Sequence, residues 1–102
     1  MRKLFPIFAV LSLAMTACAG PSADEFRQRD VQGNTACIHF GSGYTDHGSV
    51  GRTNVAKAAE HGLASSTESI RNAVSTDNDG KPVIDDQAAF KKACEQQGMS
   101  FK

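Results

Sequence analysis

The chain has 102 residues, a length that allows one small domain. Eleven basic side chains balance eleven acidic ones, so the formal net charge is zero. This balance excludes the strongly basic character of nucleic-acid-binding domains, and we expect no nucleic-acid partner. No polybasic segment is present that would attract anionic lipid head groups.

The first residues have the form of an export signal. Arg2 and Lys3 follow the first methionine, and the apolar run Leu4–Ala14 comes next. This run is shorter than the roughly 20 residues of a membrane-spanning helix. A charged start, a short apolar middle and small residues at the end are typical of a secretory signal peptide.

The small residues lead directly to a cysteine. The stretch "MTAC" at residues 15–18 resembles the lipobox of bacterial lipoproteins, with Met15 where leucine is usual. The resemblance implies a signal peptide over residues 1–17, cleavage before Cys18, a diacylglycerol joined to its thiol by a thioether, and a fatty acyl group such as palmitate on its new amino group. The alternative is cleavage after Ala19 in an ordinary A-x-A pattern, which would release a soluble protein.

The residue after the cysteine is Ala19 rather than aspartate. By resemblance to enterobacterial lipoproteins, this favours the outer membrane. We therefore expect a cell-envelope protein that is anchored to the outer membrane through acylated Cys18 and faces the periplasm. Charged and polar side chains dominate residues 18–34 and predict a lipidated tether, which leaves residues 35–102 for the folded domain.

Within the tether a short helix over Ala23–Val31 is an alternative, although only Phe26 and Val31 could anchor it.

The residues after the tether predict a strand and then a loop. The segment Thr35–Phe40 carries β-formers between two glycines and predicts a short buried strand. Four glycines in residues 41–51 then predict a loop.

The segment "RTNVAKAAEHGL", residues 52–63, predicts a helix. Its apolar residues recur at helical spacing, and Gly62 is a stop signal near its end. The apolar residues are Val55, Ala58, Ala59 and Leu63.

Residues 65–76 fit two structures. Ser65 and Glu68 could form a capping box for a helix, whereas Ser69–Thr76 could form an edge strand. Asp79-Gly80 lies between two runs that contain valines, which is a hairpin signal. We therefore favour strand, turn and strand.

The last segment predicts a helix that begins at Asp85 or Asp86, either of which can cap it. Gly98 lies beyond its end. Its apolar stripe consists of Ala89, Phe90, Ala93 and Cys94. The expected fold class is α+β, a small single domain with the order strand, helix, hairpin, helix.

If Cys18 carries lipid, Cys37 and Cys94 remain as an even pair in an exported domain. Such a pair predicts a disulfide between the first and last elements. The alternative is two separately buried thiols, because free cysteine is a common core residue.

Two groups of residues raise the possibility of a metal site. The first contains His39, His47 and His61 with Cys37 and Asp46, and its spacing matches no familiar ligand pattern. The second is a calcium-like loop over residues 75–86, in which Asp77, Asp79, Gly80 and Asp86 occupy EF-hand positions. That loop departs from the pattern at Ser75 and Pro82. We assign no metal ligand and no cofactor from either group.

Catalytic motifs are absent from the sequence. No serine lies in a G-x-S-x-G elbow or an S-x-x-K pair, and Asp85-Asp86 is better placed to cap a helix than to act as an acid–base pair. We expect a protein without enzymatic activity.

The run from Thr35 to Leu63 is similar in layout to small bacterial lipoproteins of the TRL-like type. The shared features are an opening strand with cysteine, a glycine-rich turn, an alanine-rich helix and a glycine. The resemblance implies a fold of strand, helix and two strands, and no established activity.

These observations predict an envelope lipoprotein that binds another envelope protein or serves a structural role. A small metal- or ligand-binding module is the first alternative. An inhibitor or immunity lipoprotein is the second.

Overall fold

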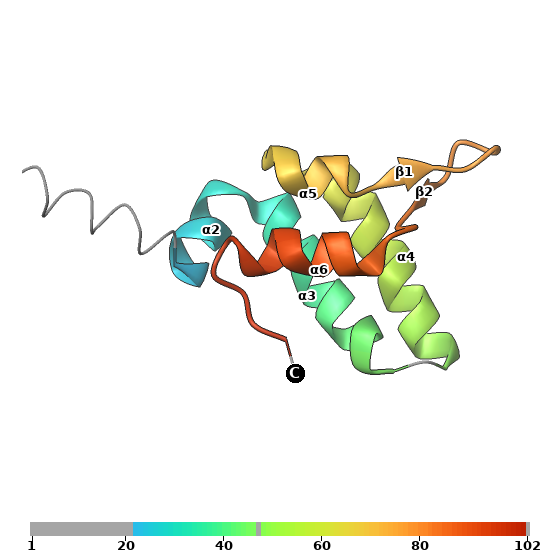
Figure 1. Cartoon of the computed structure of the whole chain (residues 1–102), viewed down its shortest axis with the longest axis horizontal. Coiled ribbons are helices and arrows are strands. Elements are labelled where there is room, and N and C mark those ends of the chain that lie inside the picture. Colours follow the sequence, from blue (N-terminus) through green and yellow to red (C-terminus); the bar gives the residue numbers. More distant parts are fainter. Residues whose placement is uncertain (1–21, 47, 102) are drawn as a thin grey trace, which may run out of the picture.

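The computed structural model describes residues 22–46 and 48–101, which form a small, mostly helical domain (Figure 1). In chain order the elements are α2 (Ala23–Arg29), α3 (Val31–Thr45), α4 (Ser49–Leu63), α5 (Glu68–Asn72), β1 (Ser75–Thr76), β2 (Pro82–Val83) and α6 (Gln87–Glu95). The predicted α+β class is therefore confirmed only in part. Among the described residues the two strands form one antiparallel sheet, and the other elements are helices.

Helices α3 and α4 pack against each other as an antiparallel hairpin (Figure 1). Close approach at their connected ends requires glycine. A Cβ on Gly43 would lie 2.6 Å from the carbonyl oxygen of Gly51, and a Cβ on Gly51 would overlap the backbone carbonyl oxygen of Asp46. These contacts leave no room for a side chain at either position.

The strand predicted over residues 35–40 and the loop predicted over residues 41–51 are both wrong. The strand residues lie inside α3, and the loop residues are shared between the end of α3, a short connection and the start of α4. Ala36, Cys37 and Phe40 are fully buried along one side of α3, at the spacing of a helix face. Two of the glycines that suggested a loop, Gly43 and Gly51, lie where α3 and α4 pack together, whereas Gly48 lies in the connection between them.

The predicted tether over residues 18–34 needs correction, because α2 occupies Ala23–Arg29 and α3 begins at Val31. Ser22 and Glu25 form a capping box at the start of α2, and the hydrogen bonds from Ser22 hold the pKa of Glu25 below its usual value. The alternative helix over Ala23–Val31 is confirmed in part: Phe26 is fully buried in the core, but α2 ends at Arg29 and Val31 is exposed at the start of α3. Arg29 also donates a hydrogen bond of 2.6 Å to Gln97, beyond α6.

The helix predicted over residues 52–63 is confirmed as α4, which begins slightly earlier. Ala58 and Ala59 are fully buried, but Leu63 is 41% exposed and does not belong to the core. Gly62 is part of the helix, where a Cβ would lie 2.8 Å from Val74. It therefore permits close packing and is not a stop signal.

The ambiguous residues 65–76 contain a short helix and a strand. Helix α5 occupies residues for which we favoured a strand, and Thr67 precedes it in place of the predicted cap Ser65. The predicted hairpin is confirmed, with Ser75 opposite Val83. Gly80 adopts a φ of 80° in its turn, a conformation that suits glycine.

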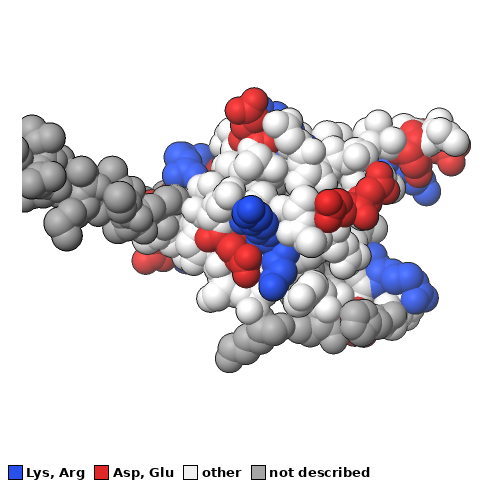
Figure 2. All heavy atoms as spheres, viewed as in Figure 1, with Lys and Arg blue, Asp and Glu red and all other residues white. Residues whose placement is uncertain are grey.

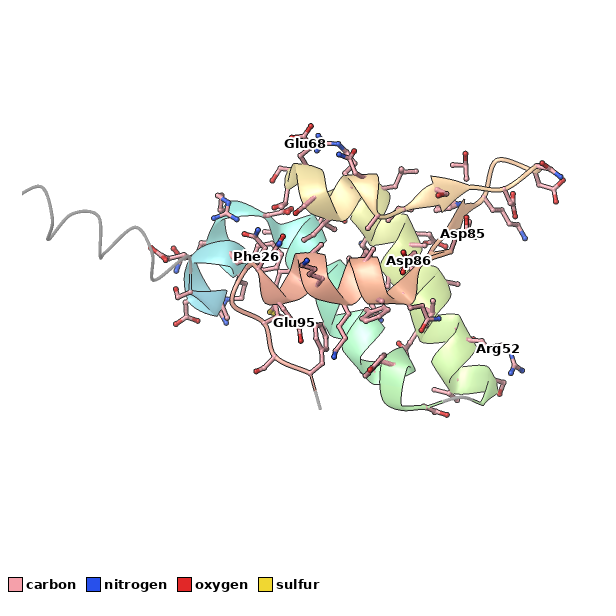
Figure 3. All side chains as sticks on the ribbon, in the orientation of Figure 1. Phe26, Arg52, Glu68, Asp85, Asp86 and Glu95 are labelled. Atoms are coloured by element: carbon pink, nitrogen blue, oxygen red, sulfur yellow. A yellow bond between two sulfur atoms is a disulfide. The ribbon has the colours of Figure 1, made fainter. Side chains whose placement is uncertain are left out.

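The last predicted helix is confirmed as α6. Figure 3 shows Asp85 and Asp86 where the hairpin ends and α6 begins, and Asp86 caps the helix by accepting a 3.0 Å hydrogen bond from the Ala89 amide. Phe90, Ala93 and Cys94 are buried as expected, whereas Ala89 is exposed. The centroid of the Phe90 ring lies 5.0 Å from the centroid of the Phe40 ring on α3.

Candidate functional site

The predicted disulfide is present between Cys37 on α3 and Cys94 on α6. Their Cα atoms are 5.8 Å apart, and both side chains are fully buried. The bond ties the first half of the domain to its last helix. It also removes Cys37 from any set of metal ligands.

Two of the three histidines meet between α3 and α4. The rings of His39 and His61 are nearly parallel, with 4° between their planes and 5.6 Å between their centroids. Both side chains are half-buried. Each ring bonds to an amide on the opposite helix: His39 Nδ1 lies 2.9 Å from Asn54 Oδ1, and His61 Nδ1 lies 2.7 Å from Gln32 Oε1.

The arrangement follows from spacing within an antiparallel helix pair. Gln32 and His39 are seven residues apart on α3, and Asn54 and His61 are seven residues apart on α4. Seven residues make about two helical turns, so each pair lies on one helix face. The sequence prediction missed the pair because it placed His39 in a strand.

The remaining residues of the first candidate metal group do not join this pair. His47 and the predicted lipidation residue Cys18 lie outside the described residues. Asp46 ends α3 and accepts a 2.9 Å hydrogen bond from the Gly48 amide. Within residues 22–46 and 48–101, no group of three or more His, Cys, Asp or Glu side chains is placed to hold a metal ion.

The residues of the calcium-like loop have local structural contacts. Asp77 Oδ1 accepts 2.9 Å hydrogen bonds from the amides of Asp79 and Lys81, which shapes the hairpin turn. Asp86 caps α6. Asp77 and Asp86 therefore act as a turn residue and a helix cap.

A buried carboxylate, Asp30, connects the α2–α3 junction to the segment between α4 and α5. It is 3% exposed and accepts hydrogen bonds from the Ser65 hydroxyl at 2.5 Å, the Thr67 hydroxyl at 2.7 Å and the Gly33 amide at 2.8 Å. The amides of Ser66 and Thr67 also donate to it. Burial acts to raise the pKa of Asp30, but these hydrogen bonds outweigh it and lower the pKa to about 2. The contact with the Gly33 amide is the one that the sequence signals, because aspartate is a preferred N-cap residue and Asp30 caps α3.

An open groove of about 460 Å³ lies between α3 and the C-terminal segment. It is lined by Cys37, Ile38, Gly41, Ser42, Met99, Ser100 and Phe101. Ile38 is 54% exposed, and Val31, seven residues earlier on α3, is 63% exposed. One side of α3 therefore presents apolar side chains to the surroundings.

The charged side chains form no large patch of one sign on the face shown in Figure 2, where acidic and basic groups are interspersed. Among the helices of the described residues, none has the length and apolar character needed to cross a membrane. No family model, curated protein or solved structure matches the chain.

Proposed function

We propose that the protein is a lipid-anchored component of the cell envelope that acts by binding another envelope protein, without catalysis. The lipobox-like stretch at residues 15–18 supports an acyl anchor on Cys18, and Ala19 supports the outer membrane facing the periplasm. The Cys37–Cys94 disulfide is consistent with an oxidising compartment.

The observation that carries the proposal is how soon the fold begins after Cys18. The capping box of α2 starts at Ser22, and Phe26 is already part of the core. Four residues of extended chain reach at most roughly 14 Å. An anchored domain would therefore lie directly at the lipid head groups, where it could contact only membrane-proximal partners.

Intact mass spectrometry of the membrane fraction tests the anchor. The expected chain begins at Cys18 and carries acyl mass, and Cys18→Ser should give an unprocessed or unanchored product. Ala19→Ser, which keeps the cysteine, is the matched control and should remain anchored. A soluble mature protein that begins at Gly20 would contradict the proposal.

Binding to a partner is tested by a photo-crosslinking residue placed at Ile38, on the apolar side of α3. The matched control is the same residue at Glu60, an exposed position on α4. We expect one envelope protein to crosslink from position 38 and not from position 60. No adduct at position 38, or the same adducts at both positions, would count against a binding surface there.

A metal-binding module is the second candidate function. The observation that favours it is the contact between His39 and His61, which brings together two ligating side chains from different helices.

A further inference from the structure

From the histidine pair between α3 and α4, we propose that His39 and His61 bind one divalent transition-metal ion, copper(II) most tightly, through their Nε2 atoms. This site develops the second candidate function. It does not depend on lipidation of Cys18, so the two ideas can fail separately.

The hydrogen bonds determine which ring nitrogen is available. Asn54 Nδ2 donates to the Val50 carbonyl oxygen, so Asn54 Oδ1 is the atom that faces His39. An amide oxygen can only accept, and His39 Nδ1 must therefore carry the proton. Its Nε2 is then the atom with a lone pair in the neutral ring.

His61 has the same arrangement, because its Nδ1 lies against Gln32 Oε1. Metal-binding histidines commonly donate their second ring N–H to an oxygen in this way, which fixes the tautomer and the ring orientation. Both histidines are thus prepared as Nε2 ligands by an amide on the opposite helix.

The separation of the rings suits a shared ion. Two imidazoles on one ion have centroids roughly 5 Å apart, since each metal–nitrogen bond is about 2 Å long. The observed separation is 5.6 Å. The two ring planes are parallel to within 4°, so the Nε2 lone pairs do not converge in this arrangement. The χ2 torsion of histidine is broad, and we expect binding to turn the rings until both Nε2 atoms reach one ion.

Ligand chemistry selects the ion. Imidazole binds copper, zinc and nickel, and copper(II) forms the most stable complexes among the divalent ions of this series. With two protein ligands, water would occupy the other positions. Lys57 lies one turn before His61 on α4 with an exposed side chain, and its positive charge opposes a bound cation.

The test is titration of the purified full-length protein with copper(II) chloride, followed by electron paramagnetic resonance. We expect one ion with two nitrogen ligands. His39→Gln and His61→Gln should each weaken binding at least about tenfold and remove one nitrogen from the spectrum, because a direct ligand matters at least as much as its supporting contacts. His47→Gln is the matched control and should change neither quantity.

Two further measurements separate binding from folding. Asn54→Ala should weaken copper binding about tenfold while two nitrogens remain in the spectrum, because it loosens one ring without removing a ligand. In the wild-type protein, copper(II) should broaden the backbone NMR signals around His39 and His61 before others. Unchanged binding in His39→Gln and His61→Gln, loss of binding in His47→Gln, or broadening centred elsewhere would overturn the proposal.

Discussion

Replacement of Asp30 by asparagine is the sharpest test of how this domain is held together. The two carboxylate oxygens accept five hydrogen bonds, from the Ser65 and Thr67 hydroxyls and from three backbone amides. Asparagine keeps one accepting oxygen and places an NH₂ group where the other oxygen was. At least one backbone amide then faces a donor, whichever way the side-chain amide is turned.

The size of the effect follows from the pKa and the hydrogen bonds. A carboxyl whose pKa falls from 3.8 to about 2 on folding stabilises the folded state by roughly 2 kcal/mol at neutral pH. An unsatisfied buried donor costs a further 1–3 kcal/mol or so. We expect Asp30→Asn to lower the free energy of unfolding by about 3 kcal/mol at pH 7, a large share of the total for a small domain.

The effect depends on pH in a defined direction. Because the pKa of Asp30 is lower in the folded state, its stabilisation is complete above the unfolded value near 3.8 and is lost as the pH falls toward 2. The stability difference between the wild type and Asp30→Asn should therefore shrink by roughly 2 kcal/mol from pH 6 to pH 2.

Urea denaturation followed by circular dichroism at a series of pH values measures this difference. Asp24→Asn is the matched control, since Asp24 lies in α2 with a side chain that is 80% exposed and an ion pair to Arg27. We expect this control to change stability by less than about 1 kcal/mol. Equal effects of the two substitutions, or a difference for Asp30→Asn that stays constant with pH, would refute the reasoning.

Substitutions at the disulfide and at Gly51 test the packing of the fold. Cys37→Ala and Cys94→Ala should each destabilise the protein by about 4 kcal/mol, and the double variant by little more, because either change opens the same 57-residue loop. Labelling of both thiols by an alkylating reagent in the unfolded, non-reduced protein would show that the bond is absent. Gly51→Ala should lower stability by about 1–3 kcal/mol despite the higher helix propensity of alanine, because its Cβ overlaps the Asp46 carbonyl oxygen. Thermal melts can measure this against Glu60→Ala on the same helix, and a stabilising effect of Gly51→Ala would disprove the close approach of α3 and α4.

The parts of the fold that could be predicted are those with strong local signals. Helix α4 has alanines at helical spacing, α6 has an aspartate cap and an apolar stripe, and the hairpin has Asp79-Gly80 in its turn. The disulfide followed from counting cysteines in a chain that we expect to be exported. Each of these signals lies within a few residues or in the composition of the chain.

Helix α3 could not be predicted from local preference because glycine opposes it. Each interior glycine costs a helix about 1 kcal/mol relative to alanine, and α3 contains Gly33, Gly41 and Gly43. The compensating contacts come from other elements: Gly43 meets Gly51 of α4, and Gly33 lies against Ser65 beyond α4. Tertiary packing therefore decides the structure of this segment.

The same error concealed the candidate metal site. His39 and His61 are far apart in a strand–loop–helix interpretation, but an antiparallel helix pair places Gln32 opposite His61 and Asn54 opposite His39. A helical assignment of residues 31–45 makes both seven-residue pairs visible. The histidine spacing is informative only after the glycines have been recognised as the contact between two helices.

The start of the fold has the most direct consequence for function. A flexible tether over residues 18–34 would let the domain search a wide zone beyond the membrane. The capping box at Ser22 and Glu25 and the buried ring of Phe26 place the fold only a few residues after Cys18. If Cys18 carries the anchor, partners that reach this domain must themselves lie at the membrane surface, and a longer linker inserted before Ser22 should extend the set of positions that crosslink to them.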